Sequence, residues 1–324
     1  MTARPSVVVT RRLPEPVEKE LSRTFDARLN KDDRPLGPEG LKEALRTADA
    51  LLCTVTDRVT AEVLGVEPRR AKILANFGVG FNHIDIEAAK KRGIAVSNTP
   101  DVLTEATADI AITLLLMISR RTGEGERHVR SGSWTGWRPT HMLGSQVSGK
   151  VLGLVGMGRI ARAVSKRAHQ GFGMRVIFHD PYPPSPAEAA ALGAEPRASL
   201  DQVLGEADFV SLHCPAMPET RHLMNRERLG QMRRTAYLIN TARGDVVDEA
   251  ALVQALASGT IAGAGLDVFE KEPQVSPELL AMENVVLLPH LGSATQETRT
   301  AMGMRALENL RLFFSGAALR DRVV

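Results

Sequence analysis

The sequence predicts an α/β protein of two lobes, each built on a doubly wound parallel sheet. Short apolar runs alternate with segments of helical period along most of the 324 residues, and this alternation is typical of parallel sheets with helices on both faces. A chain of this length can form two domains, each with its own hydrophobic core. One apolar run, 151–155, leads into a glycine-rich turn and then into a helix.

Residues 1–100 and 288–324 are expected to form the first lobe. Its predicted strands are 6–10, 49–54, 72–77 and 94–98, and its predicted helices are 17–25, 40–47 and 86–92. Gly93 is a natural end for the last of these helices, because glycine readily adopts the left-handed conformation that closes a helix. A helical segment at 295–314 is expected to return to this lobe, which would make the lobe discontinuous in sequence.

Residues 101–287 are expected to form the second lobe. Its predicted strands are 151–155, 175–179, 209–213, 236–240, 262–268 and 285–288, with a clear helix at 248–258. A longer helical pattern, 102–121, precedes them, and Asp101 or Thr104 is placed to cap it. The centre of that pattern is apolar on nearly every side, so the helix is expected to be buried all round, in a domain junction or a subunit contact.

Both tryptophans of the chain, Trp134 and Trp137, lie in the glycine-containing segment 131–140. Two interpretations are open on the residues alone. Either the rings are packing anchors of a surface loop, or they form a wall of an active site.

Residues 156–161, Gly-Met-Gly-Arg-Ile-Ala, fit the pattern G-x-G-x-x-G/A. In that pattern Gly156 permits the tight turn, Gly158 lets the backbone approach a phosphate closely, and Ala161 allows the helix to pack on the sheet. The N-terminus of the following helix then faces the anion. The glycines alone would fit an ordinary turn equally well, but here a strand precedes them and a helix follows.

A second apolar run, 175–179, leads to Asp180, which lies 22 residues after Gly158. Rossmann domains carry an acid at about this distance, where it hydrogen-bonds the adenosine ribose. Strand, turn, helix and acid together therefore predict dinucleotide binding. A carboxylate at this place repels the 2′-phosphate of NADP(H), and no arginine follows in 181–184. NAD(H) is favoured, while Arg197, close enough in sequence to fold back, leaves NADP(H) open.

Composition argues against several other classes of protein. The 41 basic and 38 acidic residues nearly balance, and the basic ones are scattered, so nucleic acid is not expected as a partner. The longest apolar run, 110–118, is far shorter than a membrane span. Two cysteines, Cys53 and Cys214, cannot build a disulfide framework or a four-cysteine metal site, and no metal is expected. Free thiols suit a reducing cytoplasm.

Four polar residues follow or end predicted strands of the second lobe. They are Arg243, Asp267, Glu272 and His290. Each alone could have a plain structural role, Arg243 as a surface cation, Glu272 as a solvated acid and His290 as a core histidine. In open parallel sheets, however, ligands bind beyond the carboxyl ends of the strands. Their common place therefore predicts that they converge on the crevice that holds the dinucleotide.

These residue types suit hydride transfer to a 2-oxo acid. Arg243 offers the planar fork that binds a carboxylate and a carbonyl, and a protonated His290 can supply a proton to the carbonyl oxygen. Glu272 would favour the imidazolium form of that histidine. Asp267 is better placed to bond the nicotinamide carboxamide than to act as an acid or base.

A glycine-containing loop, 76–85, follows a strand of the first lobe. The amides of Val79 and Gly80 could hold an anion in a backbone nest, although a plain turn explains the glycines equally well. His83 is interpreted as a loop histidine.

The chain resembles the D-isomer-specific 2-hydroxyacid dehydrogenases and, within them, is most similar to the glyoxylate/hydroxypyruvate reductases. The resemblance covers essentially the whole chain. It is carried by the motifs at 78–80, 98–104, 153–160, 212–215, 240–245, 263–268, 270–273 and 289–293.

The resemblance implies a Rossmann cofactor domain and a flavodoxin-like substrate domain. It places the family's catalytic arginine, glutamate and histidine on Arg243, Glu272 and His290, the residues that the strand ends had indicated. It implies further cofactor contacts at Thr104, Arg159, Ile160, His213, Cys214, Pro215, Thr241, Ala242 and Gly292. Substrate contacts are implied at Val79, Gly80, Arg243, His290, Trp134 and Trp137.

The resemblance also implies homodimers joined through the cofactor lobe, in which Trp134 or Trp137 reaches the neighbour's active site and limits substrate size. Two residues depart from the family pattern. Ala161 replaces the usual third glycine, and Asp180 stands where reductases that prefer NADPH tend to carry arginine or a neutral residue.

The leading hypothesis is therefore a cytoplasmic NAD(P)H-dependent reductase of small 2-oxo acids, glyoxylate and hydroxypyruvate first. Another D-2-hydroxyacid dehydrogenase or a phosphite dehydrogenase on the same scaffold is the alternative enzyme. A dinucleotide-sensing corepressor is the alternative from another class of protein, and the complete set of arginine, glutamate and histidine argues against it.

Overall fold

The computed structural model describes residues 4–324, which divide into two compact units. One contains the chain up to Leu103 together with Ala294–Val324, and the other is Thr104–Ser293. Both boundaries lie a few residues beyond those predicted. The first helix of the second unit begins only at Thr104, and the loop around His290 is hydrogen-bonded to Asp267 of the same unit.

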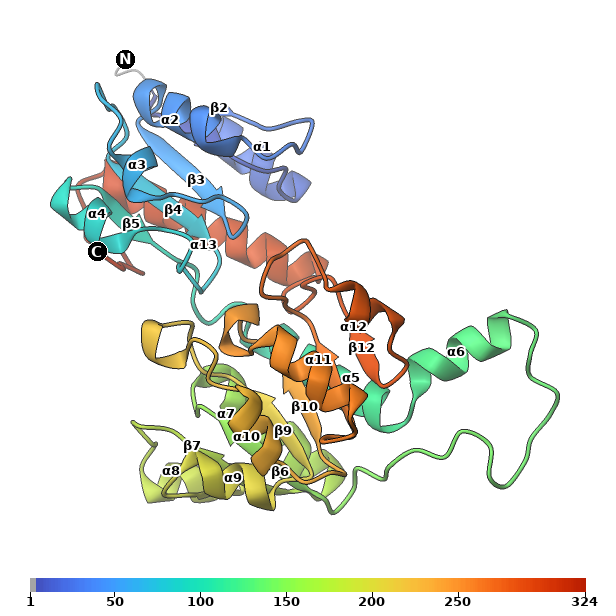
Figure 1. The fold of residues 1–324 in the computed structure, drawn as a ribbon. Coiled ribbons are helices and arrows are strands. Elements are labelled where there is room, and N and C mark those ends of the chain that lie inside the picture. The colour runs from blue at the N-terminus through green and yellow to red at the C-terminus, as the bar shows by residue number, and fades with distance from the viewer. Residues whose placement is uncertain (1–3) are drawn as a thin grey trace. The chain divides into compact units, whose positions relative to one another are not determined.

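The first unit is a five-stranded parallel sheet with the order β2-β1-β3-β4-β5 (Figure 1). The strands are β1 (Ser6–Val9), β2 (Asp26–Arg28), β3 (Ala50–Thr54), β4 (Ile73–Phe77) and β5 (Ala95–Ser97). This is the flavodoxin-like order, as the resemblance implied. The four predicted strands are confirmed. The polar three-residue strand β2 was not predicted, because three residues carry too little periodicity to detect.

Helices cover both faces of this sheet. They are α1 (Glu15–Thr24), α2 (Gly37–Thr47), α3 (Ala61–Leu64), α4 (Ile86–Lys91) and α13 (Gln296–Phe314). Successive strand residues point to opposite faces, so Leu52 packs in one core with α1 and α13 and Leu51 packs in the other with α2 to α4. Helix α13, capped by the Thr295 hydroxyl, thus returns the C-terminal segment to the first unit.

The second unit is a seven-stranded parallel sheet with the order β12-β11-β10-β9-β6-β7-β8. Its strands are β6 (Val151–Val155), β7 (Arg175–His179), β8 (Ala194–Pro196), β9 (Phe209–Leu212), β10 (Tyr237–Asn240), β11 (Gly263–Leu266) and β12 (Val285–Leu287). From β8 inward this is the Rossmann order 3-2-1-4-5-6 with one added strand. The predicted fold class is therefore confirmed. The unpredicted strand β8 is a three-residue edge strand.

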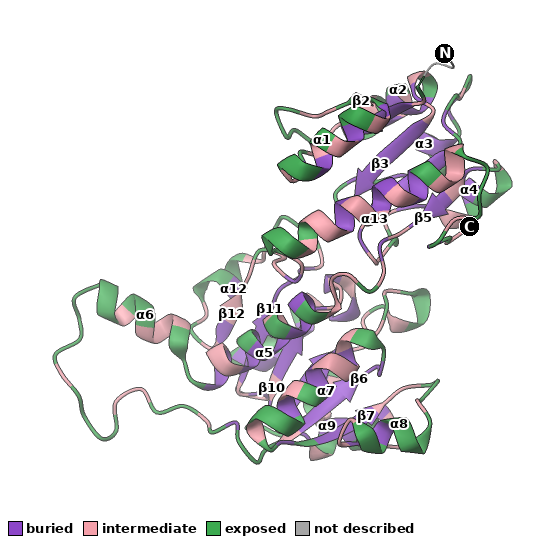
Figure 2. Ribbon diagram, turned by 180° about the vertical axis from the view of Figure 1, so that it is seen from behind, coloured by how far each residue is buried: buried purple, intermediate pink, exposed green. Residues whose placement is uncertain are grey.

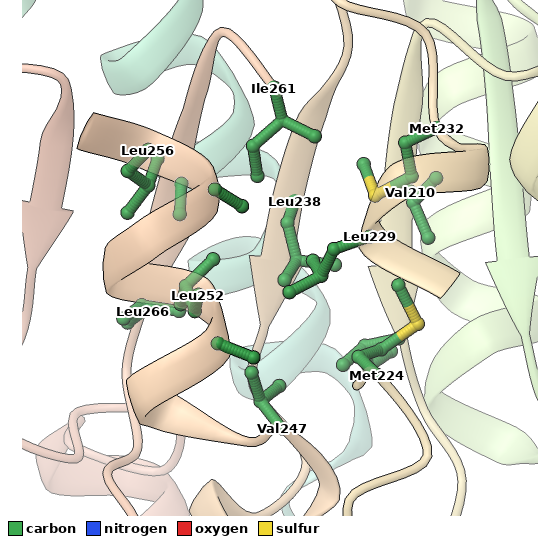
Figure 3. Packing of buried hydrophobic residues seen from close by; sticks show 14 of the residues in the cluster. Val210, Met224, Leu229, Met232, Leu238, Val247, Leu252, Leu256, Ile261 and Leu266 are labelled. Carbon is green, nitrogen blue, oxygen red and sulfur yellow. The ribbon is translucent and has the colours of Figure 1, made fainter. Parts of the chain in front are cut away.

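Two cores fill this unit, one on each face of the sheet. Helices α5 (Thr104–Ser119) and α7 (Arg159–Phe172) cover one face. The other carries α9 (Leu200–Glu206), α10 (Arg226–Gln231) and α11 (Glu249–Ala257). Figure 3 shows this second core, which contains Leu252 and Leu256 of α11 and Leu238 of the sheet. The remaining helices are α6 (Thr122–Arg130), α8 (Pro186–Ala191) and α12 (Pro277–Ala281).

Helix α5 corrects one prediction. The expected single helix over 102–121 ends at Ser119, and Arg121, with a φ of 53°, separates it from α6. The helix is not buried all round, because Glu105, Asp109 and Thr113 form an exposed stripe (Figure 2). The rest of the helix surface is buried or half-buried, and much of it packs in one core with α7 and the sheet. No helix within residues 4–324 is long and apolar enough to cross a membrane.

Candidate active site and dinucleotide site

The glycine turn lies between β6 and α7. Gly156 has a φ of 89°, and a Cβ on it would lie 3.0 Å from the backbone nitrogen of Cys214, so the turn requires glycine. Gly158 precedes α7 and supplies no side-chain cap, and a Cβ on it would meet nothing within 4 Å. Open space beside uncapped helix N–H groups fits a pyrophosphate, which such groups bind.

The next residues seat α7 on its sheet. Ala161 is fully buried, and the half-buried Ile160 packs against the same core. Arg159 is exposed in the first turn of the helix. Ala161 thus does what the motif requires of its last residue, which is to let helix and sheet approach closely.

Asp180 follows the end of β7 and is bound to the glycine turn. Its Oδ2 accepts from the backbone N–H of Met157 at 2.6 Å, and its Oδ1 accepts from that of Tyr182 at 2.7 Å. Arg197 does not fold back toward this carboxylate. Its guanidinium donates to both carboxylate oxygens of Glu206 at 2.8 Å and to Glu195 at 3.3 Å, and the Glu206 hydrogen bond raises the pKa of Arg197.

The segment after β9 lies against the same turn and is uncharged. The backbone N–H of His213 donates to the Val155 carbonyl, and the Nε2 atom of its side chain lies 2.9 Å from the Ser211 hydroxyl. Burial lowers the pKa of the His213 imidazole to about 4. Burial, with the charges of Asp180 and Asp245, raises the pKa of the Cys214 thiol to about 11. Both side chains are neutral at physiological pH, and exposed Pro215 follows them.

Glu272 and His290 form a hydrogen-bonded pair. His290 Nδ1 lies 2.9 Å from Glu272 Oε2, and Glu272 Oε1 accepts from the backbone N–H of Phe269 at 3.1 Å. Burial alone would raise the pKa of Glu272, but the hydrogen bond and charge of His290, the Phe269 N–H and the charge of Arg243 outweigh it and lower the pKa. Glu272 is therefore an ionised partner for the imidazole.

Asp267 holds the backbone of the His290 loop. His290 has a φ of 55°, and its N–H donates to the Asp267 carbonyl at 2.9 Å. The almost fully buried Asp267 carboxylate accepts from the N–H groups of Leu291 at 2.6 Å and Gly292 at 2.8 Å. Gly292 in turn accepts a hydrogen bond from the Thr107 hydroxyl at 3.0 Å. The contact between Asp267 and a nicotinamide carboxamide stays a prediction.

Arg243 lies in the loop after β10, and most of its side chain is buried. Its Nη1 donates to the Ala242 carbonyl at 2.6 Å. Burial lowers its pKa, while the charges of Glu272 and Asp245 act in the opposite direction. A guanidinium stays protonated in proteins, so the loop holds a desolvated cation within the electrostatic reach of Glu272.

Two other predicted cofactor residues lie at element ends of the same unit. Thr241 directly follows β10, and its buried hydroxyl has no hydrogen-bond partner among the described residues. An orphaned buried hydroxyl is costly unless a ligand or water satisfies it, so this observation also fits a bound cofactor. Thr104 begins α5. No group of three or more metal-ligating side chains that could hold an ion occurs within 4–324.

In the first unit, Val79 and Gly80 lie in the loop after β4. The carbonyl oxygens of 78, 79 and 80 all accept hydrogen bonds from the Asn76 and Asn98 side chains. No backbone hydrogen bond from the N–H of Val79 or Gly80 is found within the described chain. The interpretation of His83 as a plain loop residue was incomplete, because its Nε2 lies 3.0 Å from Asn76 Oδ1.

The tryptophans are not packing anchors of this chain. Trp134 is 52% exposed and Trp137 is 81% exposed, in the irregular segment after α6. Of the two interpretations left open by the sequence, the anchor interpretation is wrong for the single chain, since neither ring joins a core.

Sequence reasoning did not single out two residues that shape these loops. Asn240, almost fully buried, accepts from the Ala242 N–H at 3.0 Å and donates to the Arg243 carbonyl at 2.9 Å. Gly244 lies so close to the next loop that its Cβ would fall 1.9 Å from the carbonyl carbon of Phe269. Their only signal in the sequence was their place beside Arg243.

The model of the D-isomer specific 2-hydroxyacid dehydrogenase NAD binding domain matches residues 112–292. Among curated proteins, the chain is 47% identical to a glyoxylate reductase from Korarchaeum cryptofilum, with 97% of this chain and 94% of that protein covered. It is 46% identical to a glyoxylate reductase from Thermococcus onnurineus, again with 97% of this chain and 94% of that protein covered.

Solved structures agree with this match. A putative D-isomer specific 2-hydroxyacid dehydrogenase from Polaromonas sp. has a TM-score of 0.92 at 38% identity, covering 99% of this chain and 100% of that one. An NADPH-dependent glyoxylate/hydroxypyruvate reductase from Sinorhizobium meliloti, in complex with NADP and malonate, has a TM-score of 0.88 at 35% identity, covering 99% and 97%. With its two parallel sheets, its glycine turn and these relatives, the chain belongs to the D-isomer specific 2-hydroxyacid dehydrogenases, a family of oxidoreductases.

Proposed function

We propose that this protein reduces small 2-oxo acids, glyoxylate and hydroxypyruvate first, to 2-hydroxy acids with NAD(P)H. The observation that carries the proposal is the His290–Glu272 pair at 2.9 Å, with the half-buried Arg243 in the same electrostatic environment. All three follow strands of the Rossmann sheet at its carboxyl edge, where dinucleotides bind. The relatives named glyoxylate reductase support the choice of substrate.

The residues divide the chemistry among them. Arg243 binds the carboxylate and the carbonyl of the substrate through its planar fork. Because Nδ1 of His290 is bonded to Glu272, Nε2 is the atom that delivers the proton to the carbonyl oxygen. Ionised Glu272 stabilises the imidazolium and fixes the orientation of the ring. The reduced nicotinamide supplies the hydride when bound.

NAD(H) is the cofactor that the residues favour, with NADP(H) as the weaker alternative. The Asp180 carboxylate would repel a 2′-phosphate. Arg197, the cation that could have folded back toward Asp180, is instead paired with Glu206 and Glu195. Thr104, Arg159, Thr241 and Ala242 complete the proposed cofactor site, with the neutral segment 213–215 as its wall.

Val79 and Gly80, and a tryptophan of a second subunit, are proposed as further substrate contacts. The N–H groups of Val79 and Gly80 bind an anionic group of the substrate, since backbone N–H groups in succession form an anion nest. Trp134 or Trp137 from a neighbouring subunit limits the size of the substrate. The free thiols Cys53 and Cys214 support a reducing compartment, the cytoplasm.

A homodimer is proposed because apolar side chains gather on one projecting part of the second unit. Figure 1 shows α6 and the following loop extending away from their own sheet. The most exposed apolar residues there are Val129, Trp134, Trp137 and Leu143, between 52% and 81% exposed. A hollow of about 500 Å³ lies beside them, between the end of α5 and the segment 141–148. Apolar exposure of this kind marks a protein interface.

The test is the turnover of NADH and of NADPH with glyoxylate and with hydroxypyruvate, for the wild type and for His290→Gln. We expect NADH to be the better cofactor. The glutamine cannot deliver a proton, so kcat should fall by a factor of about 10² or more, while the dissociation constant of NADH stays within about twofold. An unchanged kcat in His290→Gln would refute the assignment. NADH binding without any 2-oxo acid reduction would favour the corepressor instead.

A further inference from the structure

The peptide groups of the loop at 78–80 are oriented by side chains that the proposed reaction does not use. In a trans peptide the carbonyl of one residue and the N–H of the next point in opposite directions. The carbonyl of Val79 is held by Asn98 Nδ2 at 2.9 Å. The N–H of Gly80 therefore points away from Asn98. The direction of this N–H group is set by one amide side chain.

The neighbouring peptide is held in the same way. The carbonyl of Gly78 accepts from Asn76 Nδ2 at 3.1 Å and from the backbone N–H of Thr99 at 3.0 Å. The N–H of Val79 consequently points outward as well. Each of these two successive N–H groups thus points away from the donors that hold the preceding carbonyl.

Asn98 is itself held by the C-terminal segment of the chain. Its N–H donates to the carbonyl of Asp321 at 3.2 Å. Its carbonyl accepts a weaker hydrogen bond from Nδ2 of Asn309, on α13, at 3.5 Å. Asn98 therefore lies between the substrate loop and residues more than two hundred positions later in the sequence.

Asp321, Asn309 and Arg305 form a hydrogen-bonded cluster next to Asn98, which we call the clamp. Asn309 is fully buried, and it donates to the Asp321 carboxylate at 3.0 Å and accepts from the Asp321 N–H at 3.1 Å. Arg305 binds the same carboxylate through two nitrogens, at 2.6 and 2.8 Å. A bidentate, largely buried ion pair of this geometry orders its surroundings. The Asp321 carboxylate and the Asn309 amide therefore both have partners within the clamp.

We propose that Asn98 is a positioning residue for substrate binding, and that the clamp of Asp321, Asn309 and Arg305 holds it in place. The inference rests on the proposed function, in which Val79 and Gly80 bind an anionic group of the substrate through their N–H groups. Without the Asn98 amide, the peptide between Val79 and Gly80 is free to rotate. The Gly80 N–H then no longer points steadily at the anion.

The experiment compares the wild type with Asn98→Leu, which has nearly the same size but no donor and adds no charge. We expect KM for glyoxylate, and the inhibition constant of the unreactive analogue oxamate, to rise about tenfold, the effect of losing one well-placed hydrogen bond. The kcat should change less than about threefold, because a loss of uniform binding raises KM alone. The dissociation constant of NADH should not change, since its proposed site lies in the other unit.

The clamp is tested by Asp321→Ala, with Asp321→Asn as the conservative variant and Arg320→Ala as the control. Asp321→Ala should raise KM and the oxamate constant in the same direction by roughly threefold, and Asp321→Asn should recover most of that loss. Arg320 lies beside the clamp, pairs with exposed Glu308 and should leave both constants unchanged.

The measurements distinguish a failure of this inference from a failure of the proposed function. Asn98→Leu with KM and the oxamate constant within twofold of the wild type would overturn the inference and leave the proposed function standing. A wild-type chain that reduces no 2-oxo acid would overturn both. If Asn98→Leu does not fold, Asn98→Ser, whose hydroxyl is too short to reach the Val79 carbonyl, is measured in its place with the same expected rise.

Discussion

Among single residues, His290 shows how the site is prepared before a substrate arrives. A residue other than glycine at positive φ costs of order 1 kcal/mol and persists only when its surroundings compensate. Here Asp267 compensates, because its carbonyl and its carboxylate together bind three successive N–H groups, those of His290, Leu291 and Gly292. The hydrogen bond between the Glu272 carboxylate and Nδ1 then fixes the orientation of the His290 imidazole. Both the backbone and the imidazole of His290 are thus held by carboxylate residues of one loop.

Replacing Gly244 by alanine should destabilise the fold by about 3 kcal/mol or more. The added Cβ would overlap the backbone of Phe269, with its carbonyl carbon at 1.9 Å and its oxygen at 2.0 Å, and backbone cannot rotate away as a side chain can. The matched control is Gly171→Ala in α7, where a Cβ meets nothing within 4 Å and alanine is the better helix former. Urea unfolding of both variants is the measurement. Equal stabilities would contradict the expectation.

His213 should make the stability of the fold depend on pH between about 6.5 and 4. Its pKa is lowered from 6.5 to about 4 by burial, so the unfolded chain takes up the proton first as the pH falls. The free energy of unfolding therefore decreases as the pH falls through this window. The contribution of His213 is complete above about pH 6.5. At about 1.4 kcal/mol per pKa unit, less the screening that partial exposure allows, the loss is about 2 to 3 kcal/mol.

Urea unfolding of the protein without cofactor, measured at several pH values from 7 to 4, tests this pH dependence. His213→Gln cannot titrate, so its stability should decline less over the same range. A decline as steep in His213→Gln as in the wild type would assign the effect to other groups.

Among the secondary-structure elements, α7 has the N-terminus at which we propose that the cofactor phosphates bind. Gly158→Ala should leave the melting temperature nearly unchanged, because its Cβ meets nothing in the chain. The same methyl group would occupy the space proposed for the pyrophosphate. The dissociation constant of NADH, followed by its fluorescence, should therefore rise about tenfold or more. NADH binding equal to that of the wild type would place the phosphates elsewhere.

Gly156→Ala provides the contrasting case at the same turn. Its positive φ and its close approach to the backbone of 213–214 make alanine strained whether or not a cofactor is present. This variant should lose stability together with NADH binding. Two glycines two positions apart are thus expected to have separate roles, one in the turn and one beside the proposed phosphate site.

For the molecule as a whole, the exposed apolar residues after α5 predict assembly. Sedimentation velocity should give a particle of twice the chain mass, and replacing Trp137 and Leu143 together by serine should shift it toward the single chain. The double exchange Val55→Ser and Phe81→Ser, at exposed apolar residues of the first unit, is the control and should not change the mass. A wild type that sediments as a single chain would rule out the dimer.

The two parallel sheets could be predicted from the sequence, because buried parallel strands appear as apolar runs and their helices as a change of period. The sequence also indicated Arg243, Glu272 and His290, because strand ends can be located from those runs. Gly156, Gly158 and Asp180 were predictable for a related reason, since one strand–turn–helix–strand unit contains all of them. These features are local in sequence or repeat with a short period.

The residues that support the proposed site could be found only in the folded chain. Asn98, Asn309 and Asp321 lie far apart in the chain, and no periodicity relates a C-terminal aspartate to a loop near residue 80. The tight contact of Gly244 with Phe269, and the hold of Asp267 on His290, likewise join segments that follow different strands. Side-chain hydrogen bonds between such segments depend on where the sheet places the strand ends, and this placement exists only once the chain has folded.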